Sequence, residues 1–378
     1  MIDWKSEKNE VLFNPRMPES AHAELYSATQ LIDTLKGQLC FATSGTSGKL
    51  KWVLLSKSGL LASAHAVNTH LNSDRNDIWL NSLPDFHVGG VGIVARAYLS
   101  GAEVIPCHFQ DSKWSPAAFH KQLDLSHATL TSLVPTQVFD LISLRLEAPS
   151  SLRAVVVGGG ALSEQVYLTA VKLGWKLLPS YGLTECASQV ATAEYDSWNL
   201  NEYPLLRPLG HVQVALDGNG FLKVKSESLL TAYLETDNSS QAFVLRDPKT
   251  AGWLTTEDKA VFEGEFIKSI TRGENFIKIC GESVDLLRLE KILEDVKLAL
   301  GFSHDATLTA IEDERVGYLL HLAVTTPVDE SVMNLVAAYQ QRVFPFERLH
   351  QIHHVNQIPR SPLNKPLKAA LNELITKT

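Results

Sequence analysis

Between about residues 38 and 200, hydrophobic positions alternate between short unbroken runs and longer stretches in which they recur at helical spacing. The short runs predict strands at 78–83, 103–106, 128–134, 154–157 and 176–178. The longer stretches predict helices at 90–99, 117–123, 137–146 and 164–173. Because strands and helices alternate, the fold class is predicted to be α/β, with helices layered around a mostly buried sheet.

The hydrophobic pattern is different on both sides of this stretch. A polar lead-in at 1–36 contains a predicted helix from Leu25 to Leu35, and Gly37 is a plausible stop. From about 205 the apolar segments shorten, and Asp217-Gly218-Asn219-Gly220 between two of them is typical of a β-hairpin. The stretch at about 205–271 is therefore predicted to be β-rich.

A third pattern begins near residue 272. A helix with apolar residues from Leu286 to Val296 is predicted to end at Gly301. The segments that follow predict strands at 306–311 and 318–324, a helix at 333–343 and a last helix from about 366. We therefore expect a large domain at 1–271 and a small α+β C-terminal domain at 272–378.

Composition and charge narrow the class of protein. The 378 residues are 45% hydrophobic and 20% charged, as in ordinary globular proteins, and a net charge of -8 opposes non-specific binding to nucleic acid. The four cysteines are scattered singly, and the sequence pattern has neither a signal peptide nor a membrane span. We therefore expect a cytoplasmic protein without a nucleic-acid partner, either a monomer or a homodimer.

The run Thr43-Ser44-Gly45-Thr46-Ser47-Gly48-Lys49-Leu50-Lys51 combines glycines, hydroxyl groups and two lysines. Glycines let backbone N–H groups approach an anion, while hydroxyls and a lysine add donors and positive charge. The run indicates a phosphate-binding loop, with an ordinary Ser/Gly surface loop as the alternative. It does not fit the P-loop of ATPases, which requires four residues between its glycines and a Ser or Thr after the lysine.

A second candidate is Ser180-Tyr181-Gly182-Leu183-Thr184-Glu185, which follows a short predicted strand. The Tyr181 ring can stack on a purine, Thr184 can donate to a phosphate, and Glu185 can bind Mg²⁺. The alternative is a strand-to-helix turn, since Thr and Glu both favour the start of a helix. Three glycines, Gly158, Gly159 and Gly160, also follow a predicted strand, where nucleotides approach the backbone of α/β proteins or where glycine is only sterically required.

Single charged residues provide weaker signals. Asp258 could accept both hydroxyls of a ribose, the charged segment 271–281 is a candidate hinge, and Lys365 lies between prolines that restrict its direction. A solvated acid, a linker and a surface lysine are the respective alternatives. His87 lies between a predicted strand and a helix, where a lone histidine is more often structural than catalytic.

Five of these segments, in this order, resemble motifs of the adenylate-forming superfamily of acyl-CoA synthetases, nonribosomal-peptide adenylation domains and luciferases. They are 43–51 (TSGTTGxPK in the superfamily), 180–185 (YGxTE), 253–258 (WxxTGD), 272–281 (GRxDxxIKxxG) and 359–368 (PRTxxGK). The resemblance implies a large adenylate-forming domain, a mobile C-terminal lid with its hinge near Glu274, and ATP with Mg²⁺ as cofactors.

Within the superfamily, the chain is similar to the o-succinylbenzoate-CoA ligases of menaquinone biosynthesis. This resemblance rests on SLPDFHVGG at 82–90, on ATLTSLVPTQ at 128–137, and on Arg96, a basic position suited to pairing a second substrate carboxylate. It implies an AMP-forming acid-CoA ligase that uses a small carboxylic acid and coenzyme A.

Carried over residue by residue, the resemblance implies three groups of site residues. The expected catalytic residues are Lys365, Glu185, Thr184 and His87, and Glu185 is also the expected metal ligand. The expected nucleotide contacts are Thr43, Ser44, Gly45, Thr46, Ser47, Gly48, Lys51, Gly158, Gly159, Ser180, Tyr181, Gly182, Asp258 and Arg272. The expected substrate contacts are Arg96, His87 and Gly182.

The chain also departs from the superfamily pattern. Leu50 replaces a proline, Glu257 a glycine, Glu274 and Asn275 an acidic pair, and Asn364 the glycine before the lysine. The region before the phosphate loop is short for the superfamily. Three alternatives stay open: an adenylating enzyme for another aryl or acyl acid, one that uses a carrier protein as acceptor, and a catalytically silent nucleotide-binding module.

Overall fold

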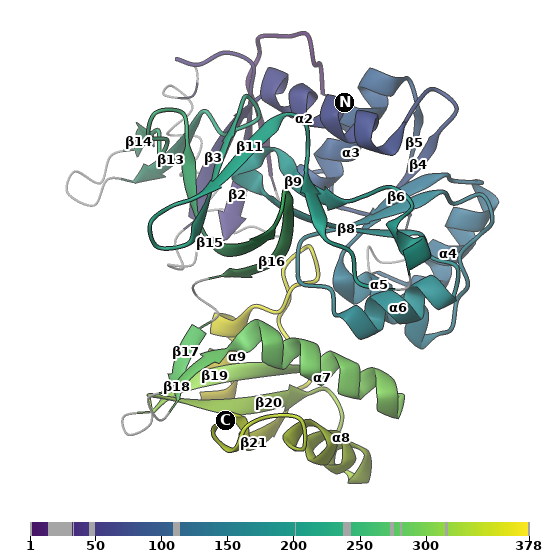
Figure 1. Cartoon of the computed structure of the whole chain (residues 1–378), viewed down its shortest axis with the longest axis vertical. Coiled ribbons are helices and arrows are strands. Elements are labelled where there is room, and N and C mark those ends of the chain that lie inside the picture. The colour runs from purple at the N-terminus through teal and green to yellow at the C-terminus, as the bar shows by residue number, and fades with distance from the viewer. Residues whose placement is uncertain are drawn as a thin grey trace.

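The structure is a computed structural model that describes residues 2–13, 32, 34–44, 50–108, 114–200, 202–236, 243–272, 276–279, 282–313 and 317–376. A large body, coloured purple to dark green, lies above a smaller C-terminal body in light green and yellow (Figure 1). Within the described ranges the strands form three sheets, of eleven, five and five strands. This mixed architecture confirms the predicted α/β fold class.

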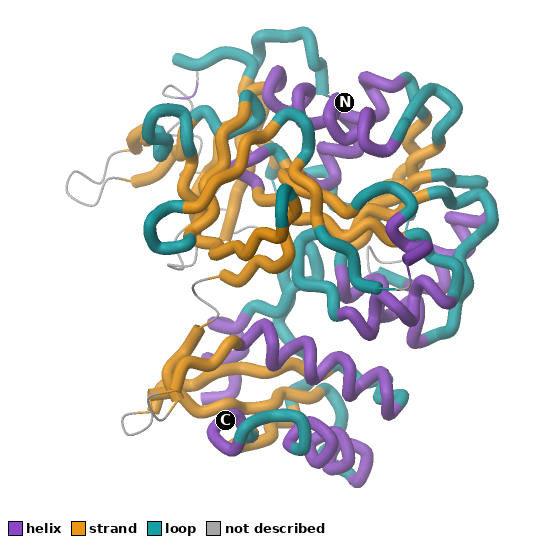
Figure 2. Tube along the Cα trace, viewed as in Figure 1, coloured by secondary structure: helices purple, strands orange, loops and turns teal. Residues whose placement is uncertain are grey.

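The parallel half of the eleven-stranded sheet has the order β8-β7-β6-β4-β5. Its strands are β4 (Ile78–Asn81), β5 (Glu103–Pro106), β6 (Leu130–Leu133), β7 (Ala154–Val157) and β8 (Leu177–Leu183). Alternate residues on these strands face opposite layers, because Val156 packs with α2 and α3 whereas Val155 packs with α4, α5 and α6. Those helices are α2 (Lys57–Leu71), α3 (Val88–Ser100), α4 (Pro116–Leu125), α5 (Pro135–Ser143) and α6 (Glu164–Lys172). Helices therefore cover both faces of this half, as Figure 2 shows in purple around the orange strands.

The antiparallel half continues the same sheet in the order β11-β12-β15-β16-β10-β9-β8. Its additional strands are β9 (Ser188–Ala193), β10 (Leu206–Pro208), β11 (Val212–Leu216), β12 (Phe221–Ser226), β15 (Leu254–Glu263) and β16 (Phe266–Arg272). The predicted hairpin joins β11 to β12, where Asp217 Oδ1 accepts hydrogen bonds from the backbone N–H groups of Asn219 and Phe221, both at 2.8 Å. Gly220 has φ +82°, a conformation that favours glycine.

The second sheet has the order β1-β2-β3-β13-β14. Its strands are β1 (Glu10–Leu12), β2 (Gln38–Ser44), β3 (Leu50–Ser56), β13 (Ala232–Thr236) and β14 (Phe243–Arg246). The stretch at about 205–271 is β-rich, as predicted, but its strands are divided between two sheets. Most of them extend the eleven-stranded sheet, whereas β13 pairs with β3 beside the candidate phosphate loop.

Helix α2 is not anticipated by the hydrophobic pattern, because it begins with two polar residues and buries one of them. Ser56 caps the helix by accepting a hydrogen bond from the backbone N–H of Gly59. The Lys57 side chain is 4% exposed and its Nζ lies 2.9 Å from Glu10 Oε1. It also donates to the backbone carbonyls of Asp3, Ser6 and Lys8 at 2.8–3.3 Å. Lys57 therefore fastens the N-terminal segment to the large body.

The C-terminal body contains a third sheet with its own hydrophobic core. Its strands are β17 (Phe276–Ile279), β18 (Glu282–Asp285), β19 (Ala306–Asp313), β20 (Gly317–Val324) and β21 (Leu349–His354). Its helices are α7 (Leu286–Leu300), α8 (Glu330–Gln340) and α9 (Lys368–Thr376). As predicted, α7 ends at Gly301, which has φ +63°. Helix α8 begins three residues earlier than predicted, because Asp329 caps it by accepting a hydrogen bond from the backbone N–H of Val332.

Two predictions fall largely on residues outside the described ranges. The N-terminal helix predicted up to Leu35 lies mostly in 14–31 and 33, and the domain boundary at 271/272 adjoins the undescribed residues 273–275. The division into domains at that point stays a prediction. No helix in the described part of the chain is both long and apolar enough to cross a membrane.

Candidate functional site

The segment 180–185 lies where the large sheet changes from parallel to antiparallel pairing. The first half of β8 pairs with β7 in parallel, and from Ser180 onwards the same strand pairs with β9 in antiparallel orientation. A Cβ atom on Gly182 would come within 1.6 Å of the Ser188 carbonyl oxygen, so glycine is required there. The segment is therefore an extension of β8, not only a strand-to-helix turn, and places its side chains at the edge where α/β proteins bind ligands.

The candidate adenosine residues meet at this edge. The Tyr181 hydroxyl donates a 2.7 Å hydrogen bond to Asp258 Oδ2, and burial raises the pKa of Tyr181, so the phenol is protonated. Asp258 on β15 stands directly opposite Arg272 on β16. The structure thus brings together Tyr181, Asp258 and the backbone of Arg272, which are far apart in sequence.

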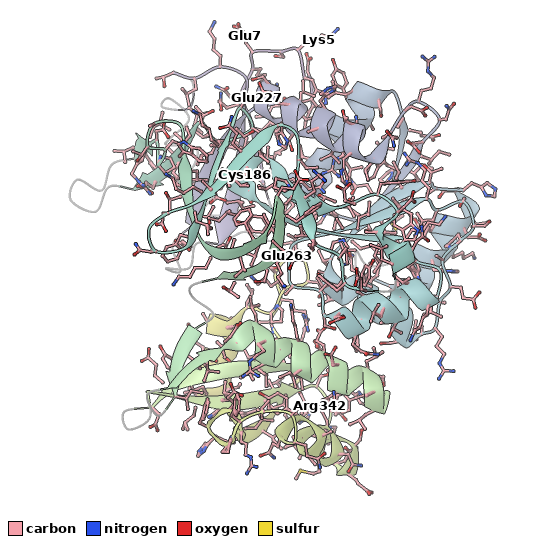
Figure 3. All side chains as sticks on the ribbon, in the orientation of Figure 1. Lys5, Glu7, Cys186, Glu227, Glu263 and Arg342 are labelled. Carbon is pink, nitrogen blue, oxygen red and sulfur yellow. The ribbon has the colours of Figure 1, made fainter. Side chains whose placement is uncertain are left out.

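The candidate metal ligand Glu185 is held by the second sheet. The Tyr233 hydroxyl donates to Glu185 Oε1 at 3.0 Å, and the backbone N–H of Leu230 donates to the Glu185 carbonyl at 2.7 Å. Thr184 and Glu185 form a short 3-10 helix (Thr184–Cys186) that packs against β3. Cys186 is fully buried inside the large body (Figure 3), and burial together with the charges of Glu185 and Asp258 raises its thiol pKa.

The candidate phosphate loop is only partly described. Thr43 pairs with Lys51 and Ser44 with Leu50 in the antiparallel hairpin of β2 and β3, so the two ends of the loop lie side by side. Gly45, Thr46, Ser47 and Gly48 lie outside the described residues. Because Val53 of β3 pairs with Tyr233 of β13, this hairpin lies beside the strand that supports Glu185.

The glycines after β7 border the same edge. The backbone N–H of Gly158 donates to the Leu133 carbonyl at 3.1 Å, and a Cβ atom at Gly158 would lie 3.0 Å from Ser180 Oγ. Gly159 has φ +80°. Ser180 Oγ in turn donates to the Val157 carbonyl at 3.1 Å. Gly158 and Ser180 are therefore neighbours at the carboxyl ends of β7 and β8.

Of the three candidate substrate residues, Gly182 lies in β8, His87 directly precedes helix α3, and Arg96 lies within that helix. His87 precedes the helix at its N-cap position without a side-chain cap hydrogen bond, and burial lowers its pKa to about 4, so the ring is neutral at pH 7. Arg96 is 2% exposed and its guanidinium lies 5.5 Å from the centre of the Trp79 ring. Arg96 Nε has no hydrogen-bond partner, and no acidic side chain in the described part of the chain pairs with Arg96. Burial lowers the pKa of Arg96 to about 10, which still leaves it charged at pH 7.

The loop at 359–367 brings Lys365 to the large body, and Figure 1 shows this yellow loop between the two bodies. Within the loop, Ser361 N–H donates to the Lys365 carbonyl at 2.8 Å. Arg360 anchors one side through two hydrogen bonds to Asp305 and one to the Asn364 carbonyl. Asn364 Nδ2 donates to Thr136 Oγ1 at 3.2 Å, at the junction of β6 and α5. The backbone of Lys365 thus lies near the edge that carries the other candidates.

Two further contacts join the bodies away from this loop. Ser163 Oγ donates to Asp295 Oδ1 at 2.7 Å, and the Lys297 ammonium lies 4.6 Å from the centre of the Phe139 ring. The predicted hinge residue Glu274 lies outside the described residues, so its role stays a prediction.

The motifs did not identify two residues of this site, Tyr233 and Thr136. Tyr233 orients Glu185 from a strand 48 residues later in the chain, and only the fold could reveal it. Thr136 lies in the segment 128–137 that the resemblance quotes, and its place directly after a buried strand is a weak signal in the sequence. No group of three or more His, Cys, Asp or Glu residues in the described ranges could hold a metal ion. One carboxylate is nevertheless compatible with Mg²⁺, which usually keeps waters and binds substrate phosphates.

The fold and the converging side chains indicate an enzyme of a nucleotide-binding class. Residues 38–223 match the family described as AMP-binding enzyme. The chain belongs to the AMP-binding, adenylate-forming superfamily.

Known proteins share sequence and fold with this chain. The 2-succinylbenzoate–CoA ligase of Bacillus mycoides is 25% identical over 349 residues, which are 88% of this chain and 69% of that enzyme. The o-succinylbenzoate CoA synthetase of Bacillus subtilis in complex with its acyl-adenylate intermediate has a TM-score of 0.71 at 23% identity, over 88% of this chain and 68% of that one. Its complex with ATP and magnesium ion also has a TM-score of 0.71, at 22% identity over 88% and 69%.

Proposed function

We propose that this chain is an AMP-forming acid-thiol ligase, and that its acid is o-succinylbenzoate. In the first step a substrate carboxylate oxygen attacks the α-phosphorus of ATP, and pyrophosphate leaves with the bond electrons. In the second step the thiol of coenzyme A attacks the acyl carbon and AMP leaves. The observation that carries the proposal is the convergence of the segment with Tyr181 and Glu185, of Asp258, and of the Lys365 loop, three segments distant in sequence, at one sheet edge.

The leaving pyrophosphate requires positive charge and hydrogen-bond donors. The segment 43–51 would hold the β and γ phosphates through backbone N–H groups, the hydroxyls and Lys51. Glu185 would hold Mg²⁺, which would supply positive charge against the phosphates, and Thr184 would donate to phosphate. Figure 1 labels β2, β3 and β13, the three strands that carry or adjoin these groups.

The adenosine half of ATP would lie against the strands β7, β8, β15 and β16. Asp258 would accept hydrogen bonds from the ribose hydroxyls, and Arg272, opposite it in the ladder, would support the same sugar. The ring of Tyr181 and the backbone at Gly158, Gly159, Ser180 and Gly182 would border the base and the α-phosphate. Glycine at 182 lets β8 and β9 pair closely along this surface, because a Cβ atom there would collide with the Ser188 carbonyl.

Lys365 would stabilise the first step by contacting the attacking carboxylate and the α-phosphate. We expect Lys365→Ala to abolish carboxylate-dependent pyrophosphate release and to spare thioester formation from supplied acyl-adenylate, because only the first step needs this charge. Both half-reactions can be followed separately by pyrophosphate and thioester assays. Equal pyrophosphate release by variant and wild type would show that Lys365 does not act in the first step.

The substrate proposal rests on Arg96. A buried guanidinium without an acidic partner is costly, and a substrate carboxylate would supply the missing charge. o-Succinylbenzoate has two carboxylates, one to be activated and one to pair with Arg96. His87, neutral at pH 7, would contact the substrate through hydrogen bonding or packing, not through charge.

Coenzyme A is the proposed acceptor, and the exchange between half-reactions would require the small domain to move about a hinge near Glu274. The direct test is a pyrophosphate-release screen over aromatic and aliphatic acids, with and without coenzyme A, that includes o-succinylbenzoate. Pyrophosphate release only with a different acid would overturn the proposal that o-succinylbenzoate is the substrate. AMP release that is independent of coenzyme A would favour another acceptor, such as a carrier protein. No release with any acid would favour a silent nucleotide-binding module.

A further inference from the structure

Asn364, the residue before Lys365, replaces the glycine of the superfamily pattern. The backbone conformation at this position restricts which residues can do so. Asn364 has φ +61°, in the left-handed region. Its N–H donates to the Ser361 carbonyl at 2.8 Å, which closes the turn that presents Lys365. Asparagine enters this region more readily than most residues other than glycine. Asn364 therefore preserves the backbone that a glycine would supply.

The side chain of Asn364 does something that a glycine cannot do. Its amide Nδ2 donates to Thr136 Oγ1 at 3.2 Å and so joins the small body to the large one. Thr136 follows Pro135 at the start of α5, shortly after β6. The strand next to β6 is β7, which is followed by Gly158. The hydrogen bond thus connects the residue next to Lys365 with the edge that carries the nucleotide candidates.

The rest of the loop is supported independently of this hydrogen bond. Arg360 is held by Asp305 and donates to the Asn364 carbonyl at 2.6 Å, and Arg360 also pairs with Pro366 in a short bridge. These contacts lie within the small body. Loss of the Asn364 amide would therefore leave the loop folded and would remove only its direct connection to the large body.

We propose that Asn364 is a positioning residue whose hydrogen bond to Thr136 holds Lys365 at the adenylation site. The proposal rests on the function proposed above. In that function, the hydrogen bond would favour the orientation of the small body in which the first half-reaction takes place. The second half-reaction, which needs Lys365 to withdraw, gains nothing from the contact.

The test compares three substitutions in the full-length enzyme. Asn364→Gly retains the left-handed backbone and removes the amide, and Thr136→Val removes the acceptor at nearly constant volume. The control is Asn72→Gly, at another left-handed asparagine (φ 49°) that ends α2 far from the small body. Carboxylate-dependent ATP–pyrophosphate exchange measures the first half-reaction, and thioester formation from supplied acyl-adenylate measures the second.

We expect Asn364→Gly and Thr136→Val each to lower kcat for exchange about two- to tenfold, the effect of one hydrogen bond, with little change in KM for ATP. The double variant should be no slower than either single variant, because both remove the same interaction. Thioester formation should not be slowed, and Asn72→Gly should match wild type in both assays.

Three results would overturn the inference. They are unchanged exchange in Asn364→Gly, equal slowing of both half-reactions, and additive effects in the double variant. These results are distinguishable from failure of the proposed function, which would appear as absence of exchange in the wild type with every acid tested and would overturn both proposals together.

Discussion

Arg96 offers the sharpest test, because its predicted contributions to stability and to function have opposite signs. Its guanidinium is buried above the Trp79 ring, its Nε has no partner, and burial lowers its pKa from 12.5 to about 10. The folded protein therefore disfavours the charged form of Arg96 by about 3 kcal/mol relative to the unfolded chain. The perturbation is Arg96→Met, which fills similar space without charge.

The expected gain is smaller than the full penalty, because the variant also loses the interaction with Trp79, worth about 0.5–2 kcal/mol. We expect Arg96→Met to raise the free energy of unfolding by about 1–2 kcal/mol, measured by urea denaturation without ligands. The matched control is Arg153→Met. Arg153 makes two hydrogen bonds to the buried carboxylate of Asp77, at 2.6 and 2.7 Å, so its loss should destabilise by about 3 kcal/mol.

The same variant should lose the preference for a dicarboxylic acid. In pyrophosphate release, Arg96→Met should lower kcat/KM for o-succinylbenzoate far more than for an aromatic monocarboxylate, since only the former needs the guanidinium. Two outcomes would refute the reasoning: destabilisation of the ligand-free protein by Arg96→Met, which would mean that Arg96 is satisfied in the fold, or equal losses for both acids.

Two further predictions concern stability. Lys57→Met should lower the free energy of unfolding by about 2–4 kcal/mol and speed proteolysis of the N-terminal segment, because Glu10 and three backbone carbonyls lose their shared donor; an unchanged Tm would contradict this. His211 has both ring nitrogens buried without partners, and burial lowers its pKa from 6.5 to about 4, so the folded protein binds this proton less readily than the unfolded chain. Its contribution to stability is therefore complete above pH 6.5 and declines as the pH falls towards 4, and His211→Phe should flatten that part of the Tm profile; an unaltered acid slope would exclude His211 as its cause.

Local patterns predict those parts of the fold whose determinants are local. The strands Glu103–Pro106 and Ala154–Val157 have the predicted bounds. Ala154–Val157 is a fully buried parallel strand, which reads as a short apolar run, whereas Glu103–Pro106 forms the edge of the sheet. Helix α2 was missed because its first residue is a lysine that becomes buried only when the N-terminal segment packs on it. The continuation of β8 through Gly182 was also missed, since the pairing with β9 that holds it is a tertiary interaction.

The candidate site divides in the same way. Motif order named Glu185, Asp258 and Arg272, and the ladder register places Asp258 opposite Arg272. The groups that orient the carboxylates could not be predicted, because Tyr181 and Asp258 are 77 residues apart and Tyr233 is 48 residues from Glu185. The sequence alone does not show whether Asn364 can adopt the backbone conformation of the glycine that it replaces. In the structure Asn364 has a left-handed conformation, which is open to glycine and asparagine.

The Tyr233 phenol leads to a prediction about the metal. Burial and the Glu185 charge raise its pKa, so the hydroxyl is always a donor and holds Glu185 Oε1 in one direction. Partners of this kind typically contribute 10- to 100-fold to metal affinity. We therefore expect Tyr233→Phe to raise the Mg²⁺ concentration for half-maximal pyrophosphate release about tenfold, with little change in KM for the acid. The control is Tyr318→Phe, whose hydroxyl donates to Glu312 on the exposed surface of the small body at 3.3 Å. An identical Mg²⁺ dependence in both variants would mean that Glu185 does not bind the metal through the geometry that Tyr233 imposes.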